Sequence, residues 1–439
     1  MIPRYEKKEI SEIWSDTYKF KTFLKIELAL ISALENKGTI PSGTRSQIEN
    51  AVQLAPQRII ELDNKLNNEV LAFCTSIMEK LPVSHARYFH FGITSSDILD
   101  TTLHLQIKKS LELLIPQLKE TCTLLIRLAE KYKKTLSIGR THGVFAEPMS
   151  FGQKWLQFYA ETARRLNELE SFLSNDLTLK LSGTVGSFSV FPPEIEDEVS
   201  QTLELKVEPV SSQILPRDRI AKLTSITALL ATTLEHIALE IRLLHRSEVN
   251  EVREGVGKAT MTQTPHRKTP LSSENITGLA RVIRSHEQIA LENCLLWHER
   301  DMSHSSAERI IIPDNLGLCF YIIKRMNKTL SSLGVDPEQI ESRVKENYTY
   351  LSTYFLHYLI EKTNLNRDIL YEMTSQAGLY AQQQKSYQAF QEKLQESLKL
   401  KEVSLTIPTL SFDEIRSIYL KHIDVIFNRV LQTYPVSKV

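Results

Sequence analysis

The sequence predicts an all-α protein built from long amphipathic helices. Glycine is scarce, at 14 of 439 residues, whereas Leu, Ile, Glu, Lys and Gln, which favour helices or are tolerated in them, are abundant. Apolar residues recur at steps of three or four along several long segments, the spacing that gathers them on one face of a helix. No strand pattern is secure, although SGTVGSFSV at residues 182–190 could form a short hairpin.

The composition excludes several classes of partner. Lys+Arg and Asp+Glu both number 53, so no overall charge favours nucleic acid or an anionic membrane. No apolar run approaches the length of a membrane span, and the N-terminal MIPRYEKKEI lacks the apolar centre of a signal peptide. The four cysteines lie far apart among apolar neighbours, without zinc spacing or a disulfide framework. We therefore expect a cytoplasmic protein with reduced thiols and no metal.

The first 93 residues are expected to form an N-terminal helical domain. Amphipathic patterns cover residues 11–37, 44–54 and 57–80, and the first ends at a turn marked by Gly38 and Pro41. The segment YFHFGITSSD at 88–97 breaks the helical rhythm and leads into the next helix at Asp97.

Residues 94–338 are expected to form a central bundle of long helices. Apolar stripes cover residues 97–133, 150–173, 220–244, 273–299 and 315–333, and a helix of about thirty residues is about 45 Å long. Several stripes are apolar on more than one face, which predicts a homo-oligomer that buries helices between copies. Further stripes at 340–359, 380–398 and 412–431 predict a smaller C-terminal helical domain over 339–439.

Four polar segments interrupt the helices, and chemistry is expected there. They are FHFGITSSD at 89–97, GRTHGVFAEP at 139–148, the stretch 255–275, and WHERDMSHSSAER at 297–309. Such breaks can meet at one end of a bundle, where helix N-termini bind anions. The longest, 255–275, carries two prolines, basic groups and hydroxyls, with no carboxylate between Lys258 and Ser273. It is either a loop that closes over an anionic substrate or an ordinary solvated linker.

Each candidate residue in these segments has a functional and a structural interpretation. His142, in a glycine-bounded turn, is either catalytic or an ordinary packed or solvated histidine. Thr94 and Ser95 either cap the following helix or bind an anion. The segment 297–309 either binds phosphate through its arginines and serines or forms a salt-bridged surface helix. No nucleotide-binding P-loop, zinc-protease or serine-hydrolase motif is present in the sequence.

Taken together, these segments resemble the adenylosuccinate lyases of the aspartase/fumarase superfamily. The resemblance covers nearly the whole chain, from MIPRY through HFGITSSDILDT, GRTHGVFAEP, SSQILPRDR and SENITGLARVIR to LWHERDMSHSSAERIIIPD. It implies a three-domain, nearly all-α fold. It also implies a homotetramer with a twenty-helix core, in which each active site draws on three subunits.

The resemblance implies a β-elimination that breaks a C–N bond in purine biosynthesis. Fumarate is released from adenylosuccinate, leaving AMP, and from the succinylated aminoimidazole carboxamide ribotide. No cofactor is implied, because the substrate carboxylate holds the developing charge. By motif match, His142 is the general acid and Glu274 sets its orientation and charge. Substrate binding is assigned to Thr94, Ser95 and Gln213 on the succinyl part, to Arg4, Tyr5, Arg300, Ser305 and Arg309 on the phosphate, and to His90, Arg267, Lys268, Thr269 and Asn275.

Two stretches depart from the family pattern. The signature loop usually reads G-S-S-x-M-P-x-K-x-N-P, and here it reads TMTQTPHRKTP. The paired serines, one of which is the catalytic base, fall on Met261 and Thr262, so Thr262 becomes the candidate base. In an upstream R-H-D-V pattern, the family histidine and aspartate are replaced by Asn68 and Glu69.

These departures leave three hypotheses open. The first is a working adenylosuccinate lyase with a variant loop. The second is a related C–N lyase that acts on a different succinylated amine or nucleotide. The third is a catalytically impaired homologue that binds nucleotide.

Overall fold

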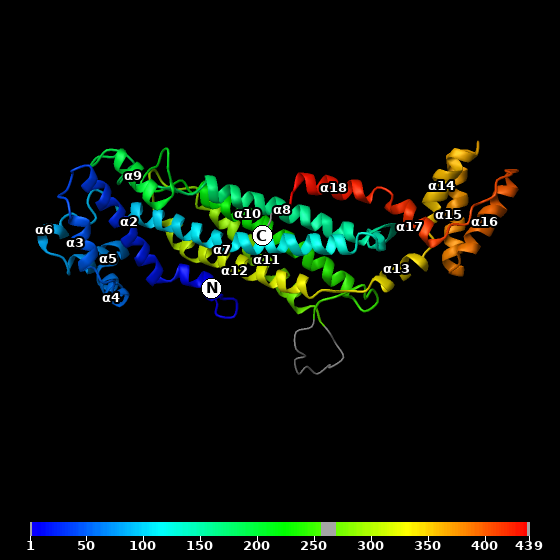
Figure 1. The fold of residues 1–439 in the computed structure, drawn as a ribbon, viewed down its shortest axis with the longest axis horizontal. Helices are drawn as coiled ribbons and strands as arrows, with labels where there is room; N and C mark the ends of the chain where they lie inside the picture. The colour runs from blue at the N-terminus through cyan, green and yellow to red at the C-terminus, as the bar shows by residue number, and fades with distance from the viewer. Residues whose placement is uncertain (1, 256–268, 437–439) are drawn as a thin grey trace.

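Long helices run along the middle of the molecule, which is elongated and mostly helical (Figure 1). The computed structural model describes residues 2–255 and 269–436. The all-α prediction is confirmed, and so is each of the five long helices. They are α7 (Ser95–Lys131), α8 (Phe151–Asn175), α10 (Asp218–His245), α11 (Leu271–Glu292) and α12 (Ser303–Ser331).

The bounds of two long helices differ from those expected. Helix α11 ends at Glu292 rather than near residue 299. Helix α12 begins at Ser303, well before residue 315, and accommodates Pro313 in its interior. The apolar stripe misplaced this start because residues 303–309, the first turns of the helix, are mostly polar. The earlier start makes Ser305 and Arg309 helical, whereas Arg300 stays in the preceding loop.

Short helices make up the N-terminal end of the molecule. The expected single helix over 57–80 is wrong, because Asn67 adopts a left-handed φ of 49° and ends one helix there. The side chain of Asn68 then caps the next, accepting a hydrogen bond of 3.0 Å from the Leu71 N–H. The elements are α1 (Lys8–Ser11), η1 (Glu12–Trp14), α2 (Asp16–Asn36), α3 (Thr44–Ala51), α4 (Pro56–Leu66), α5 (Glu69–Met78) and α6 (Val83–Ala86).

Short strands connect parts of the bundle. The hairpin expected at 182–190 is wrong, because Gly183, Gly186 and Phe188 have positive φ and turn the backbone there. A hairpin forms instead at β1 (Leu136–Thr141) and β2 (Val144–Ser150), which pair antiparallel. The other pairs are β3 (Thr178–Leu179) with β4 (Lys206–Val207) and β5 (Val252–Arg253) with β6 (Gly334–Val335), and α9 (Glu194–Leu203) lies between β3 and β4 in the sequence.

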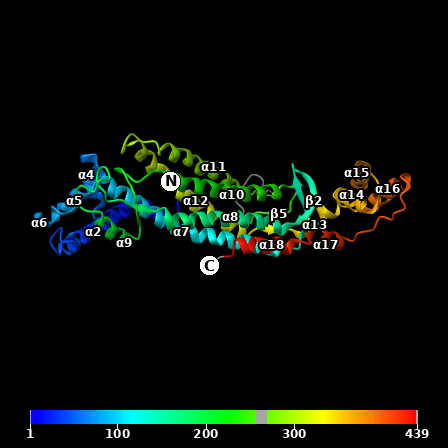
Figure 2. The same cartoon turned by 90° about the horizontal axis from the view of Figure 1, so that it is seen from above.

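The C-terminal helices form an apolar cluster separate from that of the bundle. Leu136 and Ile138 of β1 are part of this second cluster. Helix α18 instead returns along the bundle to α8, where Phe427 joins the main core (Figure 2). The helices are α13 (Pro337–Lys345), α14 (Leu351–Lys362), α15 (Arg367–Gln384), α16 (Tyr387–Leu400), α17 (Phe412–Leu420) and α18 (Ile423–Thr433).

The stripes at 380–398 and 412–431 are each interrupted. Lys385, with a φ of 49°, separates α15 from α16.

Within residues 2–255 and 269–436, no helix combines the length and apolar character needed to cross a lipid bilayer. The boundaries expected at residues 93 and 338 stay a prediction.

Candidate functional site

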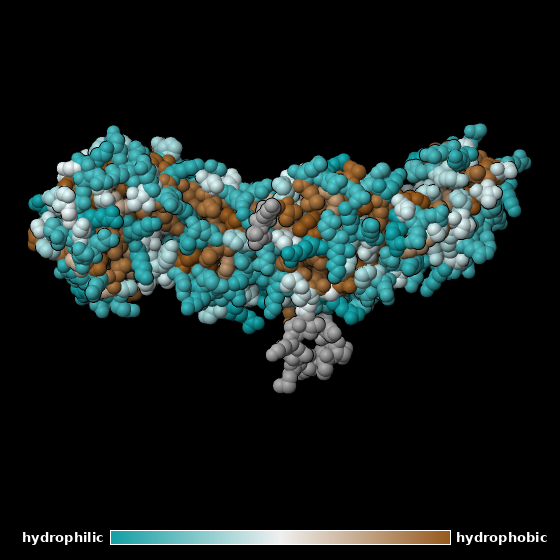
Figure 3. Space-filling model, in the orientation of Figure 1, coloured by the Kyte–Doolittle hydropathy of each residue, from teal (hydrophilic) through white to brown (hydrophobic). Residues whose placement is uncertain are grey.

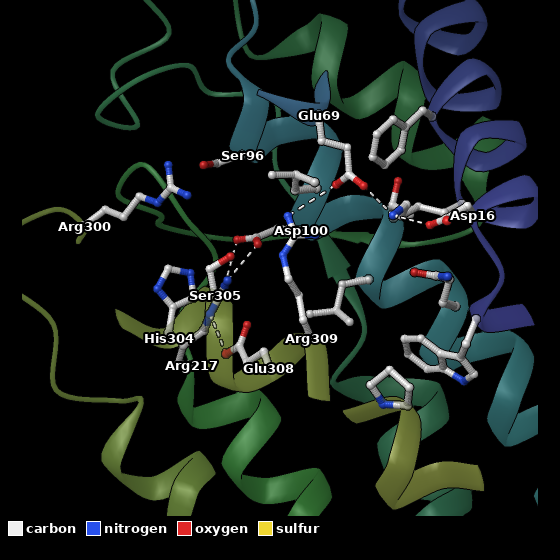
Figure 4. A pocket seen from close by; sticks show the side chains of 18 residues that line it. Asp16, Glu69, Ser96, Asp100, Arg217, Arg300, His304, Ser305, Glu308 and Arg309 are labelled. Atoms are coloured by element: carbon white, nitrogen blue, oxygen red, sulfur yellow. Dashed lines mark hydrogen bonds and ion pairs between the residues drawn. The ribbon is translucent and has the colours of Figure 1, made fainter. Parts of the chain in front are cut away.

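A cavity of about 270 Å³ lies between the N-terminal helices and the bundle (Figure 4). Three of the residues predicted to bind phosphate, Arg300, Ser305 and Arg309, line it. Arg300 Nη1 donates a hydrogen bond of 2.8 Å to Gln213 Oε1, so the predicted succinyl and phosphate residues lie in contact. No carboxylate within the described part of the chain forms an ion pair with Arg300. The cavity therefore presents a cation suited to an anionic ligand.

The start of α7 forms one wall of the cavity. The backbone N–H of Thr94 donates 2.8 Å to Asp97 Oδ2, so Thr94 lies at a capped helix start, as its structural interpretation required. Ser95 is the first helical residue. Ser96 is buried against the cavity, and its Oγ has no hydrogen-bond partner among the described residues. A buried hydroxyl without a partner is costly, and a bound polar ligand would satisfy it.

A buried network of charges supports this wall. Arg217 donates two hydrogen bonds of 2.8 Å to the carboxylate of Asp100, and its Nε lies 3.1 Å from Glu308 Oε1. Burial raises the pKa of Glu308 to about 7, with the charge of Arg217 opposing and that of Asp100 adding to the rise. Burial also lowers the pKa of His304 to about 4, so this imidazole is neutral at pH 7.

The sequence did not single out this network as part of the site. Asp97 and Asp100 lie on the buried face of a helix whose other inward residues are mostly apolar. Two acidic residues within an apolar stripe are the feature of the sequence that could have indicated buried ion pairs there. Their cationic partners, Lys180 and Arg217, lie far along the chain. Lys180 and Asp97 form a fully buried ion pair.

Glu69 also projects into the cavity (Figure 4). One carboxylate oxygen contacts Lys19 Nζ, and the other lies 3.3 Å from Arg309 Nη2. An arginine predicted to bind phosphate is therefore already paired with a carboxylate of the same chain. Asn68, at the position of the family histidine, is exposed and caps α5.

His90 lies near the start of α7, in the turn that leads to it. Its φ is 59°, and its Nδ1 lies 2.7 Å from Oε1 of the fully buried Glu27. Burial acts to lower the pKa of His90, but the hydrogen bond with Glu27 and the charges of Glu27 and Asp97 outweigh it, so the pKa is raised. Glu27 thus fixes the orientation of the His90 ring and favours its protonated form.

His142 lies at the opposite end of the bundle, at the tip of the β1–β2 hairpin. His142 and Gly143 have φ values of 54° and 80°, as a two-residue type I′ turn requires. His142 is exposed. Helix α7 has 37 residues, so about 55 Å separates its start, beside the cavity, from its hairpin end. Figure 2 shows β2 and α5 at opposite ends of the bundle. One chain alone therefore does not bring His142 to the cavity.

The first turn of α11 carries two further predicted residues. Glu274 is exposed, and Asn275 Oδ1 is buried without a partner among the described residues. Glu254 caps this turn, accepting 2.7 Å from the Ser272 N–H and 2.9 Å from the Ser273 N–H. Thr269 is exposed. The predicted residues Thr262, Arg267 and Lys268 lie outside the described residues.

The remaining predicted phosphate residues lie away from the cavity. Arg4 is exposed, and the Tyr5 ring meets Tyr321 of α12 edge to face, with 5.3 Å between ring centres. Neither Arg4 nor Tyr5 lines the cavity. Like His142, Arg4 and Tyr5 do not share a cavity with Arg300 within a single chain.

Comparison with known proteins gives a consistent result. The family model described as Lyase matches residues 8–285. The adenylosuccinate lyase of Thermotoga maritima is 37% identical over 434 residues, covering 98% of this chain and 99% of that protein. The adenylosuccinate lyase of Aquifex aeolicus is 38% identical over 386 residues, covering 87% and 88%.

Solved structures share the fold at lower identity. A fumarate lyase from Mesorhizobium sp. BNC1 superposes with a TM-score of 0.84 at 21% identity, covering 98% of this chain and 99% of that one. The 3-carboxy-cis,cis-muconate lactonizing enzyme from Pseudomonas putida gives 0.85 at 22% identity, covering 98% and 97%. These two likenesses concern the fold alone.

Proposed function

The chain belongs to the adenylosuccinate lyase family, and we propose that it releases fumarate from adenylosuccinate and from the succinylated aminoimidazole carboxamide ribotide. The observation that carries this proposal is the cavity lined by Arg300, Ser305 and Arg309, with Gln213 bonded to Arg300. A phosphate needs several fixed cationic or hydroxyl donors, and these three residues supply them. The four cysteines are free, which supports the cytoplasm as the compartment.

The proposed reaction is a β-elimination. A base removes the proton from the succinyl Cβ, and the electron pair is held on the adjacent carboxylate as an aci-carboxylate. That pair forms the C=C bond of fumarate as the C–N bond breaks, and His142 donates a proton to the leaving nitrogen. Glu274 orients His142, and Thr262 takes the role of the base. The variant loop thus keeps a hydroxyl at the position where the family has serine.

We propose that each site is assembled from several copies of the chain. His142 and the cavity lie at opposite ends of a helix about 55 Å long, so a complete site needs the hairpin of another copy. The bundle also exposes apolar side chains on α10 and α11, and Figure 3 shows apolar patches along the middle of the molecule. A homotetramer that packs these helices together would bury them. The exposed residues are Leu229, Leu239, Leu243, Leu271, Val282 and Leu291.

Subunit complementation tests the activity and the shared site together. Purified protein is assayed by absorbance for fumarate release, and His142→Ala and Arg300→Ala are each expected to lose about a hundredfold or more in kcat/KM. Co-expression of the two variants with different tags is expected to restore about one quarter of the wild-type sites, because random mixing gives some sites both intact residues.

The matched control is co-expression of two differently tagged His142→Ala chains, which should stay inactive. A mixed oligomer as inactive as its parents would contradict the shared site. Absence of fumarate release by the wild-type protein on both substrates would contradict the proposed activity.

A further inference from the structure

Glu27 is a fully buried carboxylate in the middle of α2. Burying a carboxylate is costly unless it is well paired. Both of its oxygens are used by one residue: Oε1 lies 2.7 Å from His90 Nδ1, and Oε2 accepts 3.1 Å from the His90 backbone N–H. The carboxylate therefore fixes both the ring of His90 and the backbone that carries it.

We propose that Glu27 is a positioning residue that holds the proton on His90 Nδ1 and directs Nε2 toward an anionic group of the substrate. A carboxylate accepts hydrogen bonds and does not donate them, so Nδ1 must carry a hydrogen. The other nitrogen is then the one left for a ligand. This inference rests on the proposed function, since that function supplies the substrate that His90 contacts.

The charged surroundings favour the protonated ring. Among the described residues, the titratable groups that face His90 from the packed helices are Glu27 of α2, Cys74 of α5 and Asp97 of α7. Burial alone would lower the pKa of His90, but the hydrogen bond and the two carboxylates raise it overall. The imidazolium therefore persists to higher pH than for an ordinary histidine, with Nε2–H as a charged donor.

A metal site is the competing interpretation of the same cluster. Ligand atoms of Glu27, Cys74 and His90 lie within 4.8 Å of one another, and Cys, His and Glu are zinc ligands. However, the Nδ1 that faces Glu27 is already used in a hydrogen bond. Burial, with the charge of Glu27 adding to it, also raises the pKa of the Cys74 thiol, so the thiolate that zinc needs is disfavoured. The geometry favours a hydrogen-bonded pair.

The first test uses wild-type protein and needs no activity. Protein labelled with ¹⁵N-histidine is titrated by NMR, with His90 assigned from the spectrum of His90→Gln. We expect protonated Nδ1 at every pH and a His90 pKa above 6.5. A neutral ring with its hydrogen on Nε2 overturns the proposal. So does tight binding of one Zn²⁺ per chain that is lost in Cys74→Ser.

The second test separates positioning from a purely structural role. In Glu27→Gln we expect kcat/KM to fall about ten- to a hundredfold, and we expect its decline at high pH to begin at lower pH, because His90 loses its proton earlier. Cys74→Ser, changed in the same buried cluster, should keep the wild-type profile. Glu27→Gln in a His90→Gln background should cause no further loss. Unequal losses in the two backgrounds support the proposal, and equal losses overturn it.

The two tests distinguish a wrong role for Glu27 from a wrong proposed activity. If no substrate is cleaved, the NMR titration still decides the tautomer of His90. If fumarate is released but Glu27→Gln leaves the tautomer and the pH profile unchanged, only the role of Glu27 is rejected.

Discussion

At the cavity end of the bundle, charged side chains are buried and paired, whereas at the hairpin end the proposed general acid is exposed and occupies the tip of a tight turn. Asp100 and Arg217 are both nearly inaccessible, and Arg217 binds two carboxylates. His142 adopts a positive φ of 54° at the tip. At the cavity end the buried Asp100 and Arg217 pair with one another, and the Ser96 hydroxyl has no partner among the described residues. At the hairpin end the proposed reactive group, His142, is exposed. This difference supports our proposal that the cavity end receives the substrate and that the hairpin completes the site of a neighbouring copy.

Replacing His142 by asparagine should give the largest effect and separate function from stability at the hairpin end. Asn-Gly is the favoured type I′ turn, so His142→Asn should raise the free energy of unfolding by about 0.5–1 kcal/mol. Loss of the general acid should lower kcat by about 10²- to 10⁴-fold. Urea unfolding and the fumarate assay measure the two changes. Val144→Thr, at the exposed strand residue that follows the turn, should alter neither. An active His142→Asn enzyme would show that His142 is not the general acid.

At the cavity end, the corresponding change should act on stability. Arg217→Met leaves Asp100 and Glu308 buried without their cation, and removal of one partner from a buried ion network costs about 3–5 kcal/mol. Lys222→Met is the control, because Lys222 is half-exposed in its pair with Asp176 and should cost less than about 1 kcal/mol. Equilibrium unfolding in urea compares the two variants. Equal, small losses would show that the buried Arg217 network at the cavity end stabilises the fold no more than an exposed ion pair does.

The smallest effect is expected from Glu69, which competes for the proposed phosphate site. Glu69 pairs with Arg309 and Lys19, so an arriving phosphate must displace this carboxylate from Arg309. Glu69→Gln removes the charge and should tighten AMP binding about three- to tenfold, measured by calorimetry. Asp16→Asn is the control, since Asp16 contacts Lys19 but not Arg309. Weaker AMP binding in Glu69→Gln would instead mean that Glu69 itself contacts the nucleotide.

Sequence patterns predicted the long helices well because their apolar period is local. Each stripe in α7, α8 and α10 can be recognised without knowing what it packs against. The β1–β2 hairpin was missed because its strands contain polar residues and show no clear alternation of apolar and polar side chains. The turn between them depends on the positive φ values of His142 and Gly143. The start of α12 was placed too late because its first residues, 303–309, are mostly polar and show no apolar stripe.

Part of the candidate site could be predicted from short sequence motifs, but the ion pairs between distant residues could not. Arg300, Ser305 and Arg309 were recognised within one segment, and the structure brings them to one cavity. Asp100 and Arg217 are separated by 117 positions in the chain, and no local sequence pattern predicts an ion pair between residues so far apart. Glu69 was noticed only as a substitution, because its contact with Arg309 spans 240 positions.

The apolar cluster at the C-terminal end has a consequence for heat resistance. Leu136 and Ile138 of β1 pack within this cluster rather than in the main core. Regions with separate cores can open at free energies below that of global unfolding. When the helices of this cluster loosen on warming, the hairpin loses its support, and His142 with it, while the long helices persist. Thermal inactivation should then precede loss of helical signal, and the gap between the two temperatures would report the strength of this attachment.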